Sequence, residues 1–337
     1  NIKNITRIKL SKFSTMSLQY YPNSISETIL KLSHKLQSLK PDFLFVHGDR
    51  FETLAAAIAS SSMNIPTVQF ESGDVTNGGT YDDSARHAIS RLSHVLFTTN
   101  EESKKRLIKF GEEKWRIKNF GLTSFDSLSE KNYASPKEIK KKLKLKLNRP
   151  IILFTFHSSS INYSKSYNDI KACLKSLISF ANIADIVITY PNDDLGSQAI
   201  IKEYKKIISK KNIKVHKSLG KYFYHGLMAI NYLNIQKVLC VGNSSSGIKE
   251  APFFRCVTLN IGDRQKGRLQ AGNVINVSIK KKLIKNAIKK LLNTKLKKIK
   301  SSNFKNPYYC KDSSKKILNF IENINYKKFK LLNKKYN

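Results

Sequence analysis

The chain has 337 residues, and its 61 Lys and Arg against 24 Asp and Glu give a formal net charge of +37. This length exceeds the size at which one hydrophobic core keeps growing, so we expect two domains, and the 40% of hydrophobic residues can fill both cores. No apolar run approaches the roughly 20 residues that span a bilayer, and the charge is carried mostly by Lys spread along the chain. We therefore expect a cytoplasmic protein with no membrane partner and no nucleic-acid partner.

Helices and strands alternate through the first part of the chain. A helix is predicted from Ser24 to Leu39, where apolar residues recur at helical spacing, and Pro41 ends it. The next predicted elements are a strand at Phe43–Val46, a helix at Phe51–Ser62, a strand at Pro66–Glu71, a helix at Asp82–His94 and strands at Val95–Thr98 and Ile117–Phe120. This order is typical of βαβ units, so we expect a parallel sheet in a first domain over residues 1–135.

A second alternating series follows a Lys-rich stretch that contains Pro136. We interpret residues 136–150 as an interdomain connection and residues 151–310 as a second domain. Its predicted strands are Ile151–Phe156, Ile186–Tyr190, Val238–Val241 and Val257–Ile261. Lys280–Lys300 has the pattern of an amphipathic surface helix, and residues 311–337 are predicted to form a C-terminal helix and tail. The fold class that follows is α/β with two doubly wound parallel sheets.

Polar residues follow the predicted strands of both sheets. In doubly wound sheets, ligands bind beyond the carboxyl ends of the strands, so residues at this edge are candidate site residues. They are Asp49 and Arg50, Glu71 and Asp74, His157, Asn192 to Asp194, and Asn243 to Ser246. Each alone could be a turn residue, because turns favour Asp, Asn, Ser and Gly. Their accumulation at one edge of both sheets favours a binding site.

The run Val241-Gly-Asn-Ser-Ser-Ser-Gly247 predicts a strand, a loop of small residues and the start of a helix. Free backbone N–H groups at such a helix start suit a diphosphate, because small side chains let it approach closely. The loop residues are Asn243, Ser244, Ser245, Ser246 and Gly247. Glu250, one turn further on, could accept hydrogen bonds from ribose hydroxyls, or it could only favour the helix dipole.

Three carboxylates, Asp49, Glu71 and Asp82, come from different predicted elements. If they converge, they can supply the groups for acid–base chemistry. Cationic neighbours would then separate their pKa values, and the candidates are Arg50, Arg86 and His157. Asp82, or the adjacent Asp83, could instead only cap the helix.

Two further residue types receive no chemical role. His87 and His94 lie seven residues apart on one predicted helix, and we expect them to be packed or hydrogen-bonded rather than catalytic. The four cysteines are Cys173, Cys240, Cys256 and Cys310. They form no CxxC or metal-like pair, so we predict neither a metal nor a cofactor.

Five runs of residues carry a resemblance to a known family. They are Val46–Thr53, Tyr81–His94, Tyr190–Asp194, Gly242–Pro252 and Ile261–Arg268. In this order they resemble the UDP-N-acetylglucosamine 2-epimerase family, over about Ser24 to Val277. The resemblance implies the GT-B architecture, with two Rossmann-like domains and the nucleotide between them. The motifs Gly-Asp-Arg, Asp-Asp-Ser-x-Arg-His and Gly-Asn-Ser-Ser resemble the hydrolysing branch of the family more than the non-hydrolysing one.

The resemblance also implies roles for individual residues. Asp49, Glu71 and Asp82 match essential carboxylates, and His157 matches a histidine near the sugar diphosphate. Ser245, Ser246 and Glu250 match the UDP site. Arg264 lies in a matching motif with Arg268, although both could equally form surface or interdomain ion pairs. The residues expected to bind the UDP-sugar are Arg50, Arg86, Asn192, Asn243, Ser244, Ser245, Ser246, Gly247, Glu250 and Arg264.

Three features depart from the family pattern. Gln69–Asp74 stands where the family usually has His-x-Glu-Gly-Gly-Glu, and Phe156–Ser158 stands where it has Phe-His-Pro. The family's opening strand and Gly-Thr-Arg phosphate loop have no counterpart here, a difference on the order of 50 residues, or more than one βα unit. We therefore expect an incomplete first domain and a fragment that is inactive alone.

The predicted reaction converts UDP-N-acetylglucosamine to N-acetylmannosamine and UDP, for the biosynthesis of sialic-acid-type sugars. It proceeds by elimination of UDP and hydration of the resulting glycal. The expected partner is a UDP-sugar, and we expect a homo-oligomer. The first alternative is the same reaction on UDP-N,N'-diacetylbacillosamine, which differs at C-4 and C-6. Further alternatives are a non-hydrolysing epimerase, a GT-B glycosyltransferase and, from net charge alone, a non-enzymatic polyanion-binding protein.

Overall fold

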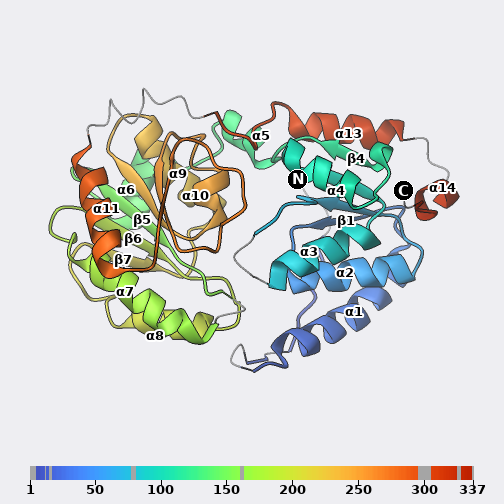
Figure 1. Cartoon of the computed structure of the whole chain (residues 1–337), viewed down its shortest axis with the longest axis horizontal. Helices are drawn as coiled ribbons and strands as arrows, with labels where there is room; N and C mark the ends of the chain where they lie inside the picture. The colour runs from blue at the N-terminus through green and yellow to red at the C-terminus, as the bar shows by residue number, and fades with distance from the viewer. Residues whose placement is uncertain are drawn as a thin grey trace. The chain divides into compact units, whose positions relative to one another are not determined.

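The computed structural model describes residues 5–11, 13–14, 17–76, 81–159, 163–294, 305–324 and 328–335. The chain forms two compact units, each with its own parallel sheet (Figure 1), and this confirms the predicted fold class. Unit 1 consists of residues 1–75, 81–126 and 308–337, and unit 2 of residues 76–80 and 127–307. Within the described ranges, no helix is long and apolar enough to cross a membrane. Residues 295–300 and 325–327, which belong to predicted helices, lie outside these ranges.

Unit 1 is built on a four-stranded parallel sheet in the order β1-β2-β3-β4. The strands are β1 (Leu44–His47), β2 (Thr67–Phe70), β3 (Val95–Thr98) and β4 (Ile117–Asn119), each within one residue of the predicted bounds. The helices are α1 (Tyr20–Leu39), α2 (Phe51–Ser62), α3 (Tyr81–Leu92), α4 (Glu101–Lys109), α13 (Ser313–Asn323) and α14 (Lys328–Leu332). Helix α5 (Ser124–Ser129) contains the boundary between the two units.

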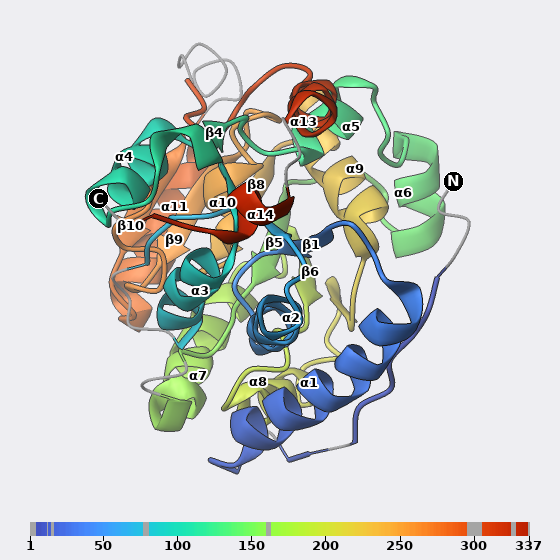
Figure 2. The ribbon, with the colours of Figure 1, turned by 90° about the vertical axis from the view of Figure 1, so that its right-hand side faces the viewer.

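Alternate residues of the unit 1 strands face two different helical layers. Val68 of β2 packs with Ile317 of α13 on one face. Val46 of β1 packs with Ala57 of α2 and Ile89 of α3 on the other face. Helix α1 lies beside α2, farther from the sheet, as Figures 1 and 2 show. Because successive side chains of a strand point to opposite faces, short strands can serve both layers.

The C-terminal segment returns to unit 1, which differs from the predicted separate helix and tail. Buried Arg116, just before β4, donates hydrogen bonds to the main-chain carbonyls of Lys330, Leu331 and Asn333. Lys334 donates to three carbonyls at the C-terminal end of α3, those of Ser90, Arg91 and Ser93. A cation at this end of a helix satisfies carbonyls that have no partner within the helix. The segment therefore fixes α3, whose first turn contains Asp82 and Asp83.

Unit 2 is built on a six-stranded parallel sheet in the order β10-β9-β8-β5-β6-β7. The strands are β5 (Ile151–Thr155), β6 (Asp185–Thr189), β7 (Ile213–His216), β8 (Val238–Gly242), β9 (Val257–Ile261) and β10 (Val274–Val277). The helices are α6 (Pro136–Leu143), α7 (Ser166–Ile178), α8 (Ser197–Lys205), α9 (Gly220–Tyr232), α10 (Ser245–Lys249) and α11 (Lys281–Asn293). Numbered within the unit, this is the 3-2-1-4-5-6 order of a Rossmann sheet, with its switch point between β5 and β8. The edge strands β7 and β10 were not predicted.

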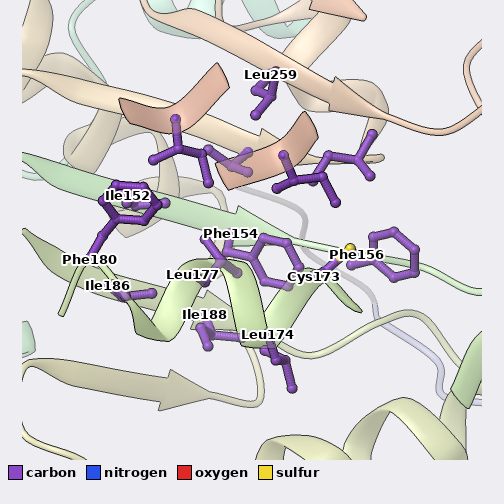
Figure 3. Close-up of a cluster of buried hydrophobic side chains, with 14 of the residues drawn as sticks. Ile152, Phe154, Phe156, Cys173, Leu174, Leu177, Phe180, Ile186, Ile188 and Leu259 are labelled. Atoms are coloured by element: carbon purple, nitrogen blue, oxygen red, sulfur yellow. The ribbon is translucent and has the colours of Figure 1, made fainter. Parts of the chain in front are cut away.

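One face of the unit 2 sheet carries the main hydrophobic core (Figure 3). Phe154 of β5 stacks on Phe156, and Leu177 of α7 packs into the same cluster. Helices α8 and α11 add buried apolar residues, among them Tyr204 and Ile284. Close packing of these apolar side chains keeps the strands rigid and so fixes the positions of the polar residues at the strand ends.

Residues 136–150 are not a simple connection, so this prediction is corrected. They begin with helix α6, and Ser135 and Glu138 form a capping box around Pro136 at its start. Ile139 and Leu143 of α6 are buried, and the helix packs on α9 within unit 2. Surface lysines on the outer face of α6 produced the Lys-rich composition that was interpreted as a linker.

We expect Lys334→Met to destabilise unit 1 by about 3 kcal/mol, because it leaves buried Glu112 with one cationic partner fewer. The Lys334 ammonium lies 2.8 Å from the Glu112 carboxylate, and their side chains are 6% and 1% exposed. Urea unfolding is followed by the fluorescence of Trp115, the single tryptophan of the chain, which lies in unit 1. Lys335→Met, at the exposed neighbouring lysine, is the matched control and should change stability by less than about 0.5 kcal/mol. Equal effects of the two variants would contradict the role of Lys334.

We expect unit 1 to lose stability as the pH falls from about 6.5 to 4 through buried His94. Burial, with Lys334 and Arg116 nearby, lowers the pKa of His94 from 6.5 to about 4. The pKa of His94 is lower in the folded state than in the unfolded state. The contribution of neutral His94 to the stability of unit 1 is therefore complete above the unfolded-state pKa. It is lost as the pH falls, because the unfolded chain takes up the proton first. A shift of this size corresponds to about 3 kcal/mol. In the same fluorescence assay, His94→Gln should flatten the pH dependence in this window, and His34→Gln at an exposed histidine should not.

Candidate functional site

Arg86 is the centre of a charged cluster in unit 1. Its side chain is 2% exposed, and its guanidinium pairs with Asp49, which follows β1. Nη1 lies 2.6 Å from Oδ1 of Asp83 and donates to the Asp74 carbonyl at 3.0 Å. Burial lowers the pKa of Arg86, but Asp49, Asp74 and Asp83 raise it by more, so the guanidinium stays charged. A buried cation with two carboxylate partners holds the end of β1 against the start of α3.

Glu71 lies just after β2, beside the end of β1. Its backbone has a left-handed φ of 58°, a conformation that non-glycine residues adopt rarely and often at functional sites. Oε1 of Glu71 lies 3.4 Å from Nε2 of His47, the last residue of β1. Because β1 and β2 are parallel neighbours, Asp49 and Glu71 follow adjacent strand ends, as predicted. His47 was not among the predicted site residues.

Asp82 and Arg50 are the sequence neighbours of the two carboxylates that pair with Arg86. Asp82 is the second residue of α3, directly before Asp83, whose carboxylate pairs with Arg86. Arg50 contacts Glu52 at 3.2 Å, and its guanidinium lies 5.4 Å from the ring centroid of Phe51. The first turn of α3 thus provides two carboxylates, and Asp83, which was expected only as a possible helix cap, belongs to the cluster.

His87, within α3, and His94, just after it, are packed or hydrogen-bonded, as expected. Nδ1 of His94 accepts a hydrogen bond from the Thr67 N–H at 3.0 Å. His87 packs its ring edge-on against Phe110, with the centroids 5.4 Å apart. Burial lowers the pKa of both imidazoles.

In unit 2, three strand ends meet at the switch point of the sheet. Asn243 follows β8, and its side-chain Oδ1 accepts from the His157 N–H at 2.7 Å while Nδ2 donates to the His157 carbonyl at 2.8 Å. Nδ1 of His157 accepts from the Asn192 N–H at 3.1 Å. His157 and Asn243 are 7% and 4% exposed. The structure therefore brings together three residues that the sequence predicted from separate strands, at the position where such sheets bind ligands.

Glycines permit the loop after β8 to approach β5 and β9. A Cβ on Gly242 would lie 1.9 Å from the carbonyl oxygen of Thr155, and a Cβ on Gly247 would lie 2.7 Å from Cγ2 of Thr258. Gly242 also has a φ of +132°. Any larger residue at either position would push the loop away from the sheet. The small residues of this motif thus serve close packing as well as ligand access.

A cavity of about 270 Å³ lies next to His157 and Asn243. Its lining residues are Phe156, His157, Ser158, Ser159, Lys165, Ser166, Asp169, Asn243, Ile261, Gly262, Asp263, Arg264 and Ile279. Nη1 of Arg264 donates to the Asn243 carbonyl at 3.2 Å, so its guanidinium is fixed at the cavity wall. The buried hydroxyls of Ser158 and Ser159 have no hydrogen-bond partner within the described ranges. Cations and unsatisfied hydroxyls together suit an oxygen-rich anionic ligand.

Two residues of α9 that the sequence analysis did not predict support the loop and helix α10. The Tyr224 hydroxyl lies 2.8 Å from Oγ of Ser246, and burial raises its pKa, so it stays protonated. Nε2 of buried His225 lies 3.3 Å from Oε2 of Glu250. The sequence signal was the aromatic run Tyr222–His225, to which no function was assigned.

The predicted residues of unit 2 thus divide between two sets. His157, Asn192, Asn243 and Arg264 belong to the switch-point set. Ser244, Ser246 and Gly247 line a cavity of about 10 Å³ with Tyr224, and Glu250 contacts α9 through His225. Ser245 is the first residue of α10. No group of His, Cys, Asp or Glu side chains in the described part of the chain could hold a metal ion.

Comparisons with known proteins identify the family of the chain. The sequence matches the family described as UDP-N-acetylglucosamine 2-epimerase over residues 4–322. A Campylobacter jejuni protein named GDP/UDP-N,N'-diacetylbacillosamine 2-epimerase (hydrolyzing) is 38% identical over 259 residues, which cover 76% of this chain and 65% of that protein. A Legionella pneumophila protein named UDP-N,N'-diacetylbacillosamine 2-epimerase (hydrolyzing) is 32% identical over 282 residues, 83% of this chain and 71% of that protein.

A solved structure shows the same fold. The UDP-GlcNAc 2-epimerase of Neisseria meningitidis, bound to UDP-GlcNAc, matches with a TM-score of 0.73 at 22% identity, over 90% of this chain and 82% of that one. This likeness confirms the GT-B type of α/β fold. The names of the two relatives support the predicted hydrolysing branch. The chain belongs to the UDP-N-acetylglucosamine 2-epimerase family.

Proposed function

We propose that the protein containing this chain is a hydrolysing nucleotide-sugar 2-epimerase that acts on UDP-N,N'-diacetylbacillosamine. The observation that carries the sugar is the 38% identity to the Campylobacter jejuni protein named for GDP/UDP-N,N'-diacetylbacillosamine. The Legionella pneumophila relative, which is named for the UDP-linked form of the same sugar, supports UDP as the nucleotide. This substrate was the first alternative in the sequence analysis, and it is better supported than UDP-N-acetylglucosamine. Because the chain spans 65% of the Campylobacter protein, the activity is assigned to the protein that contains it.

In this proposal, unit 2 binds the nucleotide. The cavity beside the switch point offers Arg264, Lys165 and the unsatisfied serine hydroxyls to the diphosphate. Cations fixed in place stabilise the charge that develops on UDP as it leaves, without rearranging during the reaction. Glu250 is assigned to the ribose hydroxyls, and His225 holds its carboxylate in position.

Unit 1 supplies the groups for proton transfer. A carboxylate removes the proton from C-2, the bond between C-1 and the diphosphate oxygen breaks, and its electron pair leaves with UDP. Water then adds its oxygen to C-1 of the glycal, and C-2 receives a proton on the opposite face. Asp49, Glu71 and Asp82 are the candidate acids and bases, now joined by Asp83. Asp49 is paired with a guanidinium and Glu71 with an imidazole, so the two can take different roles.

We expect UDP-N,N'-diacetylbacillosamine to be hydrolysed at least tenfold faster than UDP-N-acetylglucosamine at equal concentration, measured as free UDP. In deuterated water, the released sugar should carry deuterium at C-2, because the proton lost there exchanges before its replacement. Nuclear magnetic resonance of the product reports both the configuration and the deuterium. Asp49→Asn is the inactive control. Preference for the N-acetylglucosamine substrate would sink the substrate assignment, and product without deuterium at C-2 would sink the mechanism.

We expect His225→Phe to raise KM for the nucleotide sugar about tenfold and to change kcat less than twofold, because Glu250 loses the group that holds its carboxylate. His225→Gln keeps a hydrogen-bond donor and should recover most of the loss. Tyr232→Phe, at an exposed tyrosine at the end of α9, is the matched control. A KM that stays at the wild-type value in a folded His225→Phe protein would show that His225 does not position Glu250.

A further inference from the structure

A second and larger cavity lies along β7, the edge strand of the unit 2 sheet. Its volume is about 660 Å³, within the range of about 300–1,000 Å³ that is usual for ligand sites. We call it the β7 groove, lined by Lys144, Lys146, Asn148, Arg149, Asp185, Ile208, Ser209, Lys210, Lys211, Asn212, Ile213, Lys214, Val215 and His216. No residue lines both the β7 groove and the cavity at the switch point.

The fraction of Lys and Arg is higher among the residues that line the β7 groove than in the whole chain. Six of its fourteen lining residues are Lys or Arg, against 61 of 337 in the whole sequence. Among the described lining residues, Asp185 is the only carboxylate, and burial raises the pKa of that carboxyl group although Arg149 and Lys214 oppose the shift. The Lys bias of the sequence therefore does not account for this surface by itself. An uncompensated group of cations at close range favours an anionic ligand.

Buried donors without acceptors point to the same ligand chemistry. Nη1 of Arg149 and Nε2 of His216 are buried, and neither has a hydrogen-bond partner within the described ranges. Nε of Arg149 lies 3.8 Å from the Asp185 carboxylate, which is too long for a hydrogen bond. Burial, with Lys142 and Lys214 nearby, lowers the pKa of His216, so one ring nitrogen of the neutral imidazole can still donate. Buried polar groups of native proteins normally have partners, and an anion would supply the missing acceptors.

The wall of the β7 groove is held in place by the core. Lys144 and Lys146 alternate with Leu145 and Leu147, which are 5% and 7% exposed. This alternation buries the leucines and keeps both ammonium groups on the outer side. On the opposite wall, Lys214 belongs to β7, which is paired with β6 along its length. Cations on anchored backbone lose less freedom on binding than cations on loose loops.

We propose that the β7 groove binds a small polyanion that carries at least two phosphate groups. The lining includes no aromatic ring apart from the imidazole of His216, so the groove has no platform on which a base or a sugar could stack. The Arg149 guanidinium presents a planar fork of donors, which matches phosphate oxygens. The ligand is therefore recognised by its phosphates, whether these are free or carried by a larger metabolite.

The experiment is calorimetric titration of the protein with tripolyphosphate, pyrophosphate and phosphate, at fixed ionic strength and with one molar equivalent of UDP to fill the nucleotide site without an excess that would compete for the β7 groove. We expect one site, with affinity falling about tenfold from tripolyphosphate to pyrophosphate and again to phosphate. Lys210→Gln/Lys211→Gln should weaken tripolyphosphate binding at least tenfold, and both lysines are exposed, so folding should be unaffected. Lys281→Gln/Lys285→Gln removes the same charge from the exposed face of α11 and should change the affinity less than twofold.

Three outcomes overturn the proposal. Equal weakening by the two double variants would show that only net charge matters. Absence of tripolyphosphate binding would show that the groove takes no polyphosphate. A DNA duplex that displaces tripolyphosphate and binds more tightly, with the same dependence on Lys210 and Lys211, would identify a nucleic-acid surface instead. Comparison of free tripolyphosphate with ATP distinguishes the sources, because an equal affinity means that only the phosphates are recognised.

Discussion

The two hydrogen bonds between the Asn243 side chain and the main chain of His157 are the constraint on which the unit 2 site depends. They join the ends of β5 and β8, the two strands at which the sheet order reverses. An asparagine side chain presents an acceptor and a donor in the same geometry as a peptide, so it continues the pairing of the strands for one further step. Gly242 makes this possible, since a Cβ there would collide with the Thr155 carbonyl. The cavity beside His157 is a consequence of this local closure.

In unit 1, the buried cation Arg86 holds a strand end in place. Arg86 ties the end of β1 to the first turn of α3, and the C-terminal end of the same helix is held by Lys334. The helix is thus anchored at both ends by charge interactions, with its apolar face on the sheet. The ion pairs of Arg86 in this way fix the positions of Asp49 and Asp83, two of the proposed acid–base groups. This anchoring explains why so much buried charge is retained despite its desolvation cost.

Much of the architecture could be predicted because buried parallel strands are continuous apolar runs, as at Ile151–Thr155. The edge strands were missed because they are not continuous apolar runs. Strand β7, for example, carries Lys214 and His216 and is only partly buried. The connection at residues 136–150 was predicted wrongly, although the Ser135 to Glu138 capping box was visible in the sequence. The return of the C-terminal segment rests on contacts more than 200 residues apart, which no local pattern contains.

The site residues show a similar division. Side chains directly after strands, such as Asp49 and Asn243, were predictable because topology alone places each at the carboxyl edge of its own sheet. Tyr224, His225 and Asp83 were not, because their roles depend on which face of a helix is turned toward the loop or the cluster. Helix periodicity predicts the apolar face, but it does not say which polar group lies opposite a given residue.

The switch-point cavity and the β7 groove differ in local charge, although the chain as a whole is strongly basic. The switch-point cavity contains Asp169 and Asp263 beside its cations, so its charge is partly balanced. The β7 groove contains six cations and one carboxylate, so it favours a ligand of higher charge. A formal charge of +37 spread over the chain does not predict this difference between the two sites. The local arrangement of carboxylates, rather than the number of lysines, therefore distinguishes the proposed nucleotide site from the proposed polyanion site.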